Sequence, residues 1–186
     1  SAIDLDTENP LPYNERAVFY QNYKKDYNLA LIDYSKVIEL DPKNSSIYYN
    51  RAGLHIDYKK YTLALIDYSK AIELDPTDID SWYARGTLYD DYLNNNNAAL
   101  KDFEKILEID STYIDAINFI GVIYAEQNEF ERSILEYEKG IALKETNPEG
   151  AAFCYRNRAE QYIRIEQYDK ALEDYTSAID LDSENP

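Results

Sequence analysis

The feature that most constrains this sequence is a phrase that returns along its whole length. Residues 29–42 read LALIDYSKVIELDP and residues 63–76 read LALIDYSKAIELDP, so these two segments differ at one position in fourteen. Weaker copies follow at a spacing of about 34 residues. Such a period predicts a stack of similar units, because a unit of this size cannot bury its apolar face without a neighbour.

Each copy predicts two helices. Apolar residues recur at helical spacing, as in Tyr61, Ala64 and Tyr68. An Asp-Pro pair closes the second segment at Pro42 and Pro76, and proline cannot continue a helix. Small residues recur where two helices would approach closely, and aromatic residues recur where neighbouring units would meet. The expected unit is therefore an antiparallel helical hairpin.

Alignment of the copies on these prolines divides the chain into five units with partial units at both ends. The expected boundaries are 1–9 for the end of a preceding second helix, 10–44, 45–78, 79–113, 114–151 and 152–185 for the five units, and 186 for the start of a following unit. Position 8 of the units is always small: Ala17, Ala52, Gly86, Gly121 and Ala159. Position 24 is always aromatic: Tyr34, Tyr68, Phe103, Tyr137 and Tyr175.

This pattern resembles the tetratricopeptide repeat family, whose unit has about 34 residues with small, aromatic and proline positions in this order. The resemblance covers essentially the whole chain. It implies an all-α fold, a right-handed α-solenoid superhelix of antiparallel helical hairpins. It also implies a scaffold or adaptor that binds protein partners.

Two units depart from the pattern. The third has the run Asn94–Asn97 where an aromatic residue is expected, which predicts a longer and looser turn between its helices. The fourth has Gly140 near the end of its second helix and Lys144-Glu145 in place of Asp-Pro. Its segment 146–150 adds about four residues, which predicts a longer loop and a local bend or flexible point.

Composition narrows the possible partners. The formal net charge of −17 disfavours nucleic acid and acidic membrane surfaces, because phosphate contacts need clustered Lys and Arg. The same charge favours encounter with basic partners. No stretch approaches the length of a membrane span. We expect a cytoplasmic protein, and the chain reads as a segment of a longer array.

The sequence contains no Gly-rich phosphate loop, metal-ligand cluster or nucleophile elbow. The single cysteine, Cys154, excludes an intrachain disulfide and a thiolate metal cluster. The single histidine, His55, falls on an aromatic packing position of its unit, which favours a packed imidazole over a catalytic base. We therefore expect a non-enzymatic chain without a cofactor or a metal site.

An Arg and an Asp recur together in the units. The expected pairs, each joining the two helices of one hairpin, are Arg16 with Asp33, Arg51 with Asp67, Arg85 with Asp102, and Arg158 with Asp174. The fourth unit has Ile120 and Glu136 at these positions, so the Arg and the Asp are lost together. A bidentate and partly shielded pair would stabilise the hairpin more than an exposed one.

The resemblance also implies that the first helices line a concave groove. Carrying its groove positions over gives the candidate peptide-binding residues Asn14, Gln21, Tyr49, Asn50, Asp57, Asp80, Tyr83, Asp90, Asp91, Asn118, Glu126, Arg156 and Asn157. The same positions in the last two units include Asp115, Phe119, Val122 and Phe153. An Asn side chain can donate to and accept from a peptide backbone, and Asn50 and Asn157 occupy matching segments.

The middle of this groove is acidic, and basic groove residues appear only in the last unit. The positions at which some family members hold Lys and Arg to clamp a carboxylate tail contain Asn14, Tyr49, Asp80 and Ala84 here. We therefore expect a basic or neutral extended segment across Tyr49, Asn50, Tyr83, Asp91 and Asn118. The alternative is that the acidic residues form a solvated face that binds nothing.

The two ends of the chain suggest a second hypothesis. Residues 1–10 read SAIDLDTENP and residues 177–186 read SAIDLDSENP, so nine of ten positions match. The plain explanation is a higher-order duplication in a longer array. An apolar edge around Tyr168, Leu172, Tyr175 and Ile179 would still need cover, and a second copy stacked head-to-tail would provide it. Self-assembly is thus the alternative function.

Overall fold

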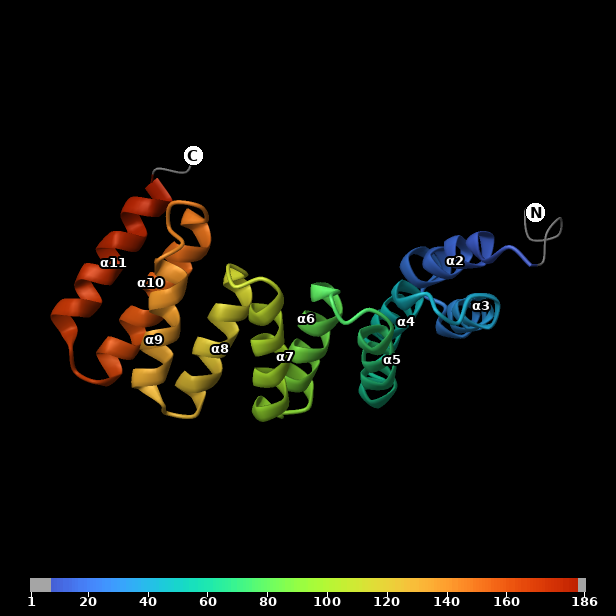
Figure 1. The fold of residues 1–186 in the computed structure, drawn as a ribbon, viewed down its shortest axis with the longest axis horizontal. Helices are drawn as coiled ribbons and strands as arrows, with labels where there is room; N and C mark the ends of the chain where they lie inside the picture. Colours follow the sequence, from blue (N-terminus) through green and yellow to red (C-terminus); the bar gives the residue numbers. More distant parts are fainter. Residues whose placement is uncertain (1–7, 184–186) are drawn as a thin grey trace. The chain divides into compact units, whose positions relative to one another are not determined.

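The computed structural model describes residues 8–183, and within them it contains ten α-helices, two π-helical segments and no strand (Figure 1). The elements are α2 (Pro10–Phe19), η1 (Tyr20–Lys24), α3 (Tyr27–Leu40), α4 (Ser45–Asp57), α5 (Tyr61–Leu74), α6 (Ile79–Thr87), η2 (Leu88–Tyr92), α7 (Asn96–Ile109), α8 (Ile114–Glu126), α9 (Phe130–Ile141), α10 (Pro148–Arg164) and α11 (Tyr168–Ser183). The all-α prediction is confirmed. Most of the expected remnant 1–9, and residue 186, lie outside the described residues.

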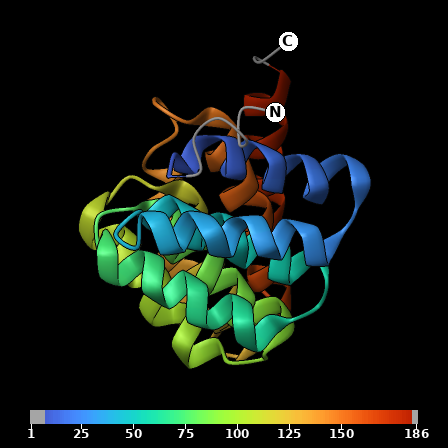
Figure 2. The ribbon, with the colours of Figure 1, turned by 90° about the vertical axis from the view of Figure 1, so that its right-hand side faces the viewer.

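The chain divides into two compact units, residues 1–94 and 95–186. In the first unit, α2 packs against α3 and α4 against α5, and Figure 2 shows α2 and α3 joined at one end by a short turn. In the second unit, α8 packs against α9 and α10 against α11. These pairs are the helical hairpins that the repeat predicts.

The turn inside each repeat uses a residue with positive φ. The five non-glycine residues of this kind among the described residues each lie between a first and a second helix: Lys25, Lys59, Asn94, Asn128 and Glu166. This left-handed conformation reverses the chain after a helix. The next backbone N–H then reaches back, as from Lys60 to the carbonyl oxygen of His55 at 2.7 Å.

The π-helical segments correct the prediction for the third unit. Residues 93–95 separate η2 from α7, and the equivalent turn of the second hairpin, residues 58–60, has the same length. The extra residue lies in η2 instead, where the helix widens by one residue. The first repeat unit contains the same kind of widened turn, in η1. There the N–H of Asp26 bonds the carbonyl oxygen of Tyr20, six residues back, whereas the corresponding bond of Lys60 spans five. The third turn is therefore not longer.

The extra residues of the fourth unit are also not all loop. Pro148 opens α10, and the Asn147 side chain accepts a hydrogen bond from the N–H of Gly150 at 2.9 Å. Asparagine before the first turn and proline in it are strong helix-start signals. The segment 148–151 therefore adds a helical turn to α10. A Cβ on Gly150 would lie 2.7 Å from the Ile114 side chain, so the added turn packs closely on α8.

The core consists of the small and aromatic repeat positions. Ala17, Ala52 and Ala159 are fully buried, and so are the aromatic rings of Tyr34 and Tyr137. A Cβ on Gly121 would lie 2.5 Å from the Tyr137 ring, so only glycine permits this approach between α8 and α9. The repeated small and aromatic residues therefore fix how closely the helices pack.

Three of the predicted Arg–Asp pairs are present and bidentate. Arg16 contacts Asp33, Arg51 contacts Asp67, and Arg158 contacts Asp174, all with two N–H···O bonds of 2.7–2.8 Å. The three carboxylates are buried. Arg85 and Asp102 belong to different compact units, and their pairing stays a prediction. Each observed pair joins the two helices of its hairpin.

Candidate functional site

In the first compact unit, residues 1–94, several candidate groove residues border one hollow of about 310 Å³. We call it the first-unit hollow. Its lining residues are Val18, Gln21, Asn22, Tyr34, Tyr49, Asn50, Gly53 and Tyr68. They come from α2, η1 and α4, with one tyrosine each from α3 and α5. The structure therefore brings the predicted residues Gln21, Tyr49 and Asn50 together.

A hydrogen-bond chain crosses the first-unit hollow. The Tyr34 hydroxyl donates to Gln21 Oε1 at 2.9 Å, and Gln21 Nε2 donates to Asp57 Oδ2 at 2.8 Å. Burial raises the pKa of Tyr34 to about 12, and the negative charge of Asp57 adds to this rise. Burial also raises the pKa of Tyr49, with a further contribution from Asp80. The hollow therefore has acidic surroundings and tyrosines that stay neutral at physiological pH.

Other candidate groove residues of the first compact unit lie outside the lining of the first-unit hollow. Asn14 does not line the first-unit hollow, and its Oδ1 is buried without a hydrogen-bond partner among the described residues. Tyr83 lies on α6, and Asp90 and Asp91 lie on η2, also outside the lining. The structure thus joins part of the predicted set and leaves these four residues apart from it.

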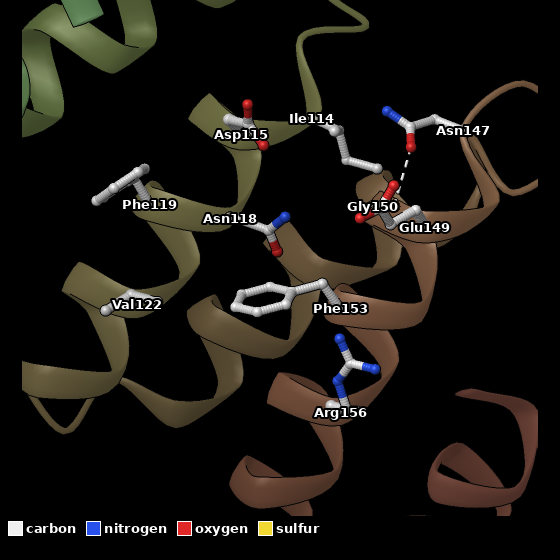
Figure 3. A pocket seen from close by; sticks show the side chains of 10 residues that line it. All are labelled: Ile114, Asp115, Asn118, Phe119, Val122, Asn147, Glu149, Gly150, Phe153 and Arg156. Atoms are coloured by element: carbon white, nitrogen blue, oxygen red, sulfur yellow. Dashed lines mark hydrogen bonds between the residues drawn. The ribbon is translucent and has the colours of Figure 1, made fainter. Parts of the chain in front are cut away.

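The second unit has a larger pocket between α8 and α10, of about 600 Å³ (Figure 3). Its lining residues are Ile114, Asp115, Asn118, Phe119, Val122, Asn147, Glu149, Gly150, Phe153 and Arg156. Three of them, Asn147, Glu149 and Gly150, belong to the added turn of α10 or to its cap. We call this site the added-turn pocket.

Side-chain contacts hold the walls of the added-turn pocket in place. The Phe119 ring stacks on Phe103 with centroids 4.9 Å apart. The Arg156 guanidinium lies over the Phe153 ring, 5.4 Å from its centroid. Asn118 Oδ1 accepts a hydrogen bond from the Cys154 thiol at 3.1 Å. The pocket thus has two aromatic walls and a polar floor with a fixed orientation.

A smaller hollow of about 260 Å³ lies further along the same helices and contains Glu126 and Asn157. Val122 borders both this hollow and the added-turn pocket. Gln161, also in its lining, is almost fully buried. Neither Asn157 Nδ2 nor Gln161 Oε1 has a hydrogen-bond partner among the described residues, so a donor and an acceptor are both unsatisfied here.

The contribution of the added turn was missed by sequence reasoning, because the segment 146–150 reads as loop. The signal was present: Asn147 followed by Pro148 is a typical helix start. The tyrosines Tyr34 and Tyr68 were assigned to packing alone, although they also border the first-unit hollow. The second omission arises from treating each repeat position as either a packing or a groove residue.

The histidine and the cysteine have packing environments. His55 is buried, with Nδ1 3.0 Å from the Tyr27 hydroxyl and Nε2 3.4 Å from Asp67 Oδ2. Burial raises the pKa of the Cys154 thiol to about 12, so it is protonated at neutral pH. Within residues 8–183, no group of three or more His, Cys, Asp or Glu side chains is placed to hold a metal ion. No helix in this range has the length and apolarity to cross a bilayer.

Helical hairpins in series, joined by small and aromatic packing residues and open along their first helices, define an α-solenoid repeat protein. Models of the tetratricopeptide repeat match residues 12–44, 45–78, 68–101, 114–147 and 154–185. The chain belongs to the tetratricopeptide repeat family. Proteins of this family typically are non-catalytic scaffolds that bind protein or peptide partners.

Solved structures agree on the fold. A crystal structure of MamA matches with a TM-score of 0.79 and 22% identity over 96% of this chain and 94% of that one. The protein YrrB, described as having an unusual peptide-binding site, matches with a TM-score of 0.73 and 24% identity over 99% and 92% of the two chains. A tetratricopeptide repeat protein from Parabacteroides merdae matches with a TM-score of 0.69 and 26% identity over 93% and 66%. A comparison with curated proteins finds no match.

Proposed function

We propose that this chain is a non-catalytic scaffold that binds an extended, basic or neutral peptide segment along the first helices of its repeats. The observation that carries the proposal is the added-turn pocket, a 600 Å³ space whose walls are mainly first-helix side chains of two successive repeats. Pockets of this size with apolar walls and a few polar groups are typical binding sites. The resemblance of the fold to YrrB supports a peptide as the ligand.

The charge around the first-unit hollow supports a basic or neutral ligand there. Asp57 and Asp80 both act on its tyrosines, and no Lys or Arg lines it. Asn50 in its lining can pair with a peptide backbone. A peptide with a high negative charge would be repelled at this position.

Display of a random peptide library against the protein tests the proposal. We expect enriched binders with the wild type and their loss with Phe153→Asp, which places a charge in the aromatic wall of the added-turn pocket. Phe153 is exposed, so the substitution leaves the core intact. Leu135→Asp is the matched control, because Leu135 is an exposed apolar residue of α9 outside every described pocket. No enrichment with the wild type, or equal loss in both variants, would contradict peptide binding.

A second candidate function, head-to-tail self-association, rests on a different observation. The helix α11 presents Tyr168, Leu172 and Ile179 at 62–67% exposure, although large apolar side chains favour burial. A second copy that covers this face would make a heterologous contact, which can propagate. Light scattering at rising concentration should show growth for the wild type and less for Leu172→Glu with Ile179→Glu. A wild type that stays monomeric at millimolar concentration would exclude this role.

A further inference from the structure

A polar residue occupies a packing position in the last repeat. Position 10 of the five units holds Phe19, Leu54, Leu88, Ile123 and Gln161. In the middle three units this side chain is at most 1% exposed, and Gln161 is only 3% exposed. An apolar side chain gains from such burial, whereas a buried amide must find hydrogen-bond partners. Packing alone therefore favours leucine or isoleucine here and does not explain Gln161.

Gln161 and Asn157 lie one helical turn apart on α10, and both line the hollow of about 260 Å³ in the second compact unit, which we call the amide hollow. Gln161 Nε2 donates to the backbone carbonyl oxygen of Asn157 at 3.1 Å, which fixes the direction of this side chain. Gln161 Oε1 and Asn157 Nδ2 are buried without a hydrogen-bond partner among the described residues. An acceptor and a donor thus lie unsatisfied side by side on one helix face.

We infer that the amide hollow binds a carboxamide group, the end of a glutamine or asparagine side chain of the bound segment. A carboxamide has an acceptor oxygen and an NH₂ donor, so it complements Asn157 Nδ2 and Gln161 Oε1 at the same time. A carboxylate lacks the donor, and an aliphatic side chain lacks both groups. The inference rests on the proposed peptide-binding function and adds to it a contact of stated chemistry.

The amide hollow has the size and the walls for one such group. Its volume of about 260 Å³ is several times the roughly 30 Å³ of one water molecule, so it admits the end of a side chain. Val122 and the Tyr137 ring give it apolar walls, and burial raises the pKa of Tyr137 to about 12, so this wall stays neutral. The last torsion of an amide side chain is broad, and a small rotation turns Gln161 Oε1 or Asn157 Nδ2 toward a ligand.

The amide hollow adjoins the added-turn pocket. Val122 borders both sites (Figure 3), and side chains of α8 and α10 line both. Phe153 and Asn157 are one turn apart on α10 and therefore share a face. One extended segment can place an apolar side chain in the added-turn pocket and an amide side chain in the amide hollow.

A bound water is the competing explanation. A water molecule has two donors and two acceptors, so it could satisfy both atoms. It does not explain why α10 has an amide where α4 and α8 have Leu54 and Ile123, because an apolar residue there needs no water. A residue that lowers stability in exchange for a polar contact is typical of a functional site.

The first test is the stability of Gln161→Leu. We expect its Tm to rise by about 3 °C, because the change restores the apolar residue of the other repeats and removes an unsatisfied acceptor. Gln167→Leu is the matched control, since Gln167 is an exposed glutamine of the next turn outside the amide hollow, and it should leave the Tm unchanged. A lower Tm for Gln161→Leu would show that Gln161 serves the fold, and would overturn the inference.

A small amide tests the hollow without any peptide. Butyramide and 2-pentanone have the same shape, but the ketone has a methyl group in place of the NH₂ donor. Both are neutral, so the charges of Glu126, Glu160 and Arg164 in the lining do not decide the comparison. In NMR spectra, millimolar butyramide should shift the side-chain amide signals of both Gln161 and Asn157, and 2-pentanone should shift those of Gln161 less. Equal shifts with the two compounds would overturn the inference, and so would no shift with either, the result for a hollow that holds water only.

Paired peptides then test the ligand itself. Fluorescent peptides with Phe and Gln at several separations are each compared with a twin that has Met in place of Gln, which keeps length and net charge. We expect the best Gln peptide to bind the wild type about fivefold more tightly than its twin, because the twin leaves both polar atoms unsatisfied. Gln161→Leu should bind the two equally, and Gln167→Leu should keep the preference.

The outcomes separate this inference from the function on which it rests. No preference for Gln at any separation, or a preference that persists in Gln161→Leu, would overturn the inference while peptide binding stands. Butyramide shifts in a protein that binds no peptide would contradict the proposed function and leave the amide site in place.

Discussion

The second and fourth hairpins have the same backbone arrangement, but different side chains hold their helices together. In α4–α5, Arg51 makes two hydrogen bonds of 2.7 Å to Asp67. In α8–α9, Ile120 is buried at the Arg position, and Glu136 bonds Lys139 on its own helix instead. The hairpin fold therefore does not require the ionic pair.

The fourth hairpin has other contacts between its helices. The Ser133 hydroxyl donates to the Gly121 carbonyl oxygen at 2.8 Å, a buried bond. The Arg132 guanidinium lies 4.0 Å from the centroid of the Tyr124 ring and donates to its hydroxyl. The repeat therefore fixes helix spacing through small and aromatic residues, while the cross-helix polar contact can change. A hairpin that has the ionic pair nevertheless depends on it, because half of a buried pair is worse than none.

The largest expected effect is in the second hairpin. Arg51→Ala should lower the free energy of unfolding by about 3 kcal/mol, because it leaves the Asp67 carboxylate, only 4% exposed, without its main partner. Glu136→Ala in the fourth hairpin should cost only about 0.5 kcal/mol, since its partner is on the same helix. Urea denaturation followed by circular dichroism measures both.

A double variant completes this test. Arg51→Leu with Asp67→Leu removes both members of the buried pair and should be more stable than Arg51→Ala. Similar costs for Arg51→Ala and Glu136→Ala would show that the two hairpins do not differ as we describe.

A smaller change in stability should distinguish Gly121 of the fourth hairpin from Gly53 of the second. Gly121→Ala should destabilise by about 2 kcal/mol, because the new Cβ would lie 2.5 Å from the Tyr137 ring in a packed core. Gly53→Ala in α4 should stabilise by about 0.5 kcal/mol, because no atom lies within 4 Å of its new Cβ and alanine favours helix. Thermal denaturation of both variants gives the signs, and a stable Gly121→Ala would contradict the close approach of α8 and α9.

The smallest expected effect is a pH dependence of stability that comes from the buried Asp67 of the second hairpin. Burial tends to raise the pKa of Asp67, but hydrogen bonds from His55 and Arg51 outweigh burial and lower this pKa below its ordinary 3.8. A lowered pKa in the folded state stabilises the protein above the ordinary value, and the contribution is lost as pH falls through the folded pKa. Urea midpoints between pH 6 and pH 3 should fall more steeply for the wild type than for Asp67→Asn. Parallel curves would argue against the shift.

The sequence predicts the hairpins well because their packing is repeated. Ala17 and Tyr34 each have equivalents in every unit, and equal residues at equal spacing imply equal contacts. Reading Arg51 with Asp67 as a pair also succeeds, since both residues vanish together from the fourth unit. Repetition thus makes an alignment possible within a single chain.

The site is less predictable because its specific parts are not repeated. The added turn occurs once, so no second copy indicates that Glu149 faces Asp115. Groove positions carried over from the family locate Asn118 and Arg156 in the pocket, but they say nothing of the Cys154 thiol that orients Asn118. Asp90 and Asp91 lie on η2 and line neither the first-unit hollow nor the added-turn pocket, so their place in the groove stays a prediction.

The π turns also bear on how such arrays can change length. One residue inserted into an ordinary helix would rotate every later side chain by about 100°, and the packing positions of the next hairpin would be lost. In η1 and η2 the widened turn absorbs the residue before the hairpin closes, and Lys25 and Asn94 still reverse the chain as Lys59 does. Units of 34 and 35 residues are therefore interchangeable as building blocks. A designer can insert a residue at the end of a first helix without recalculating the rest of the stack.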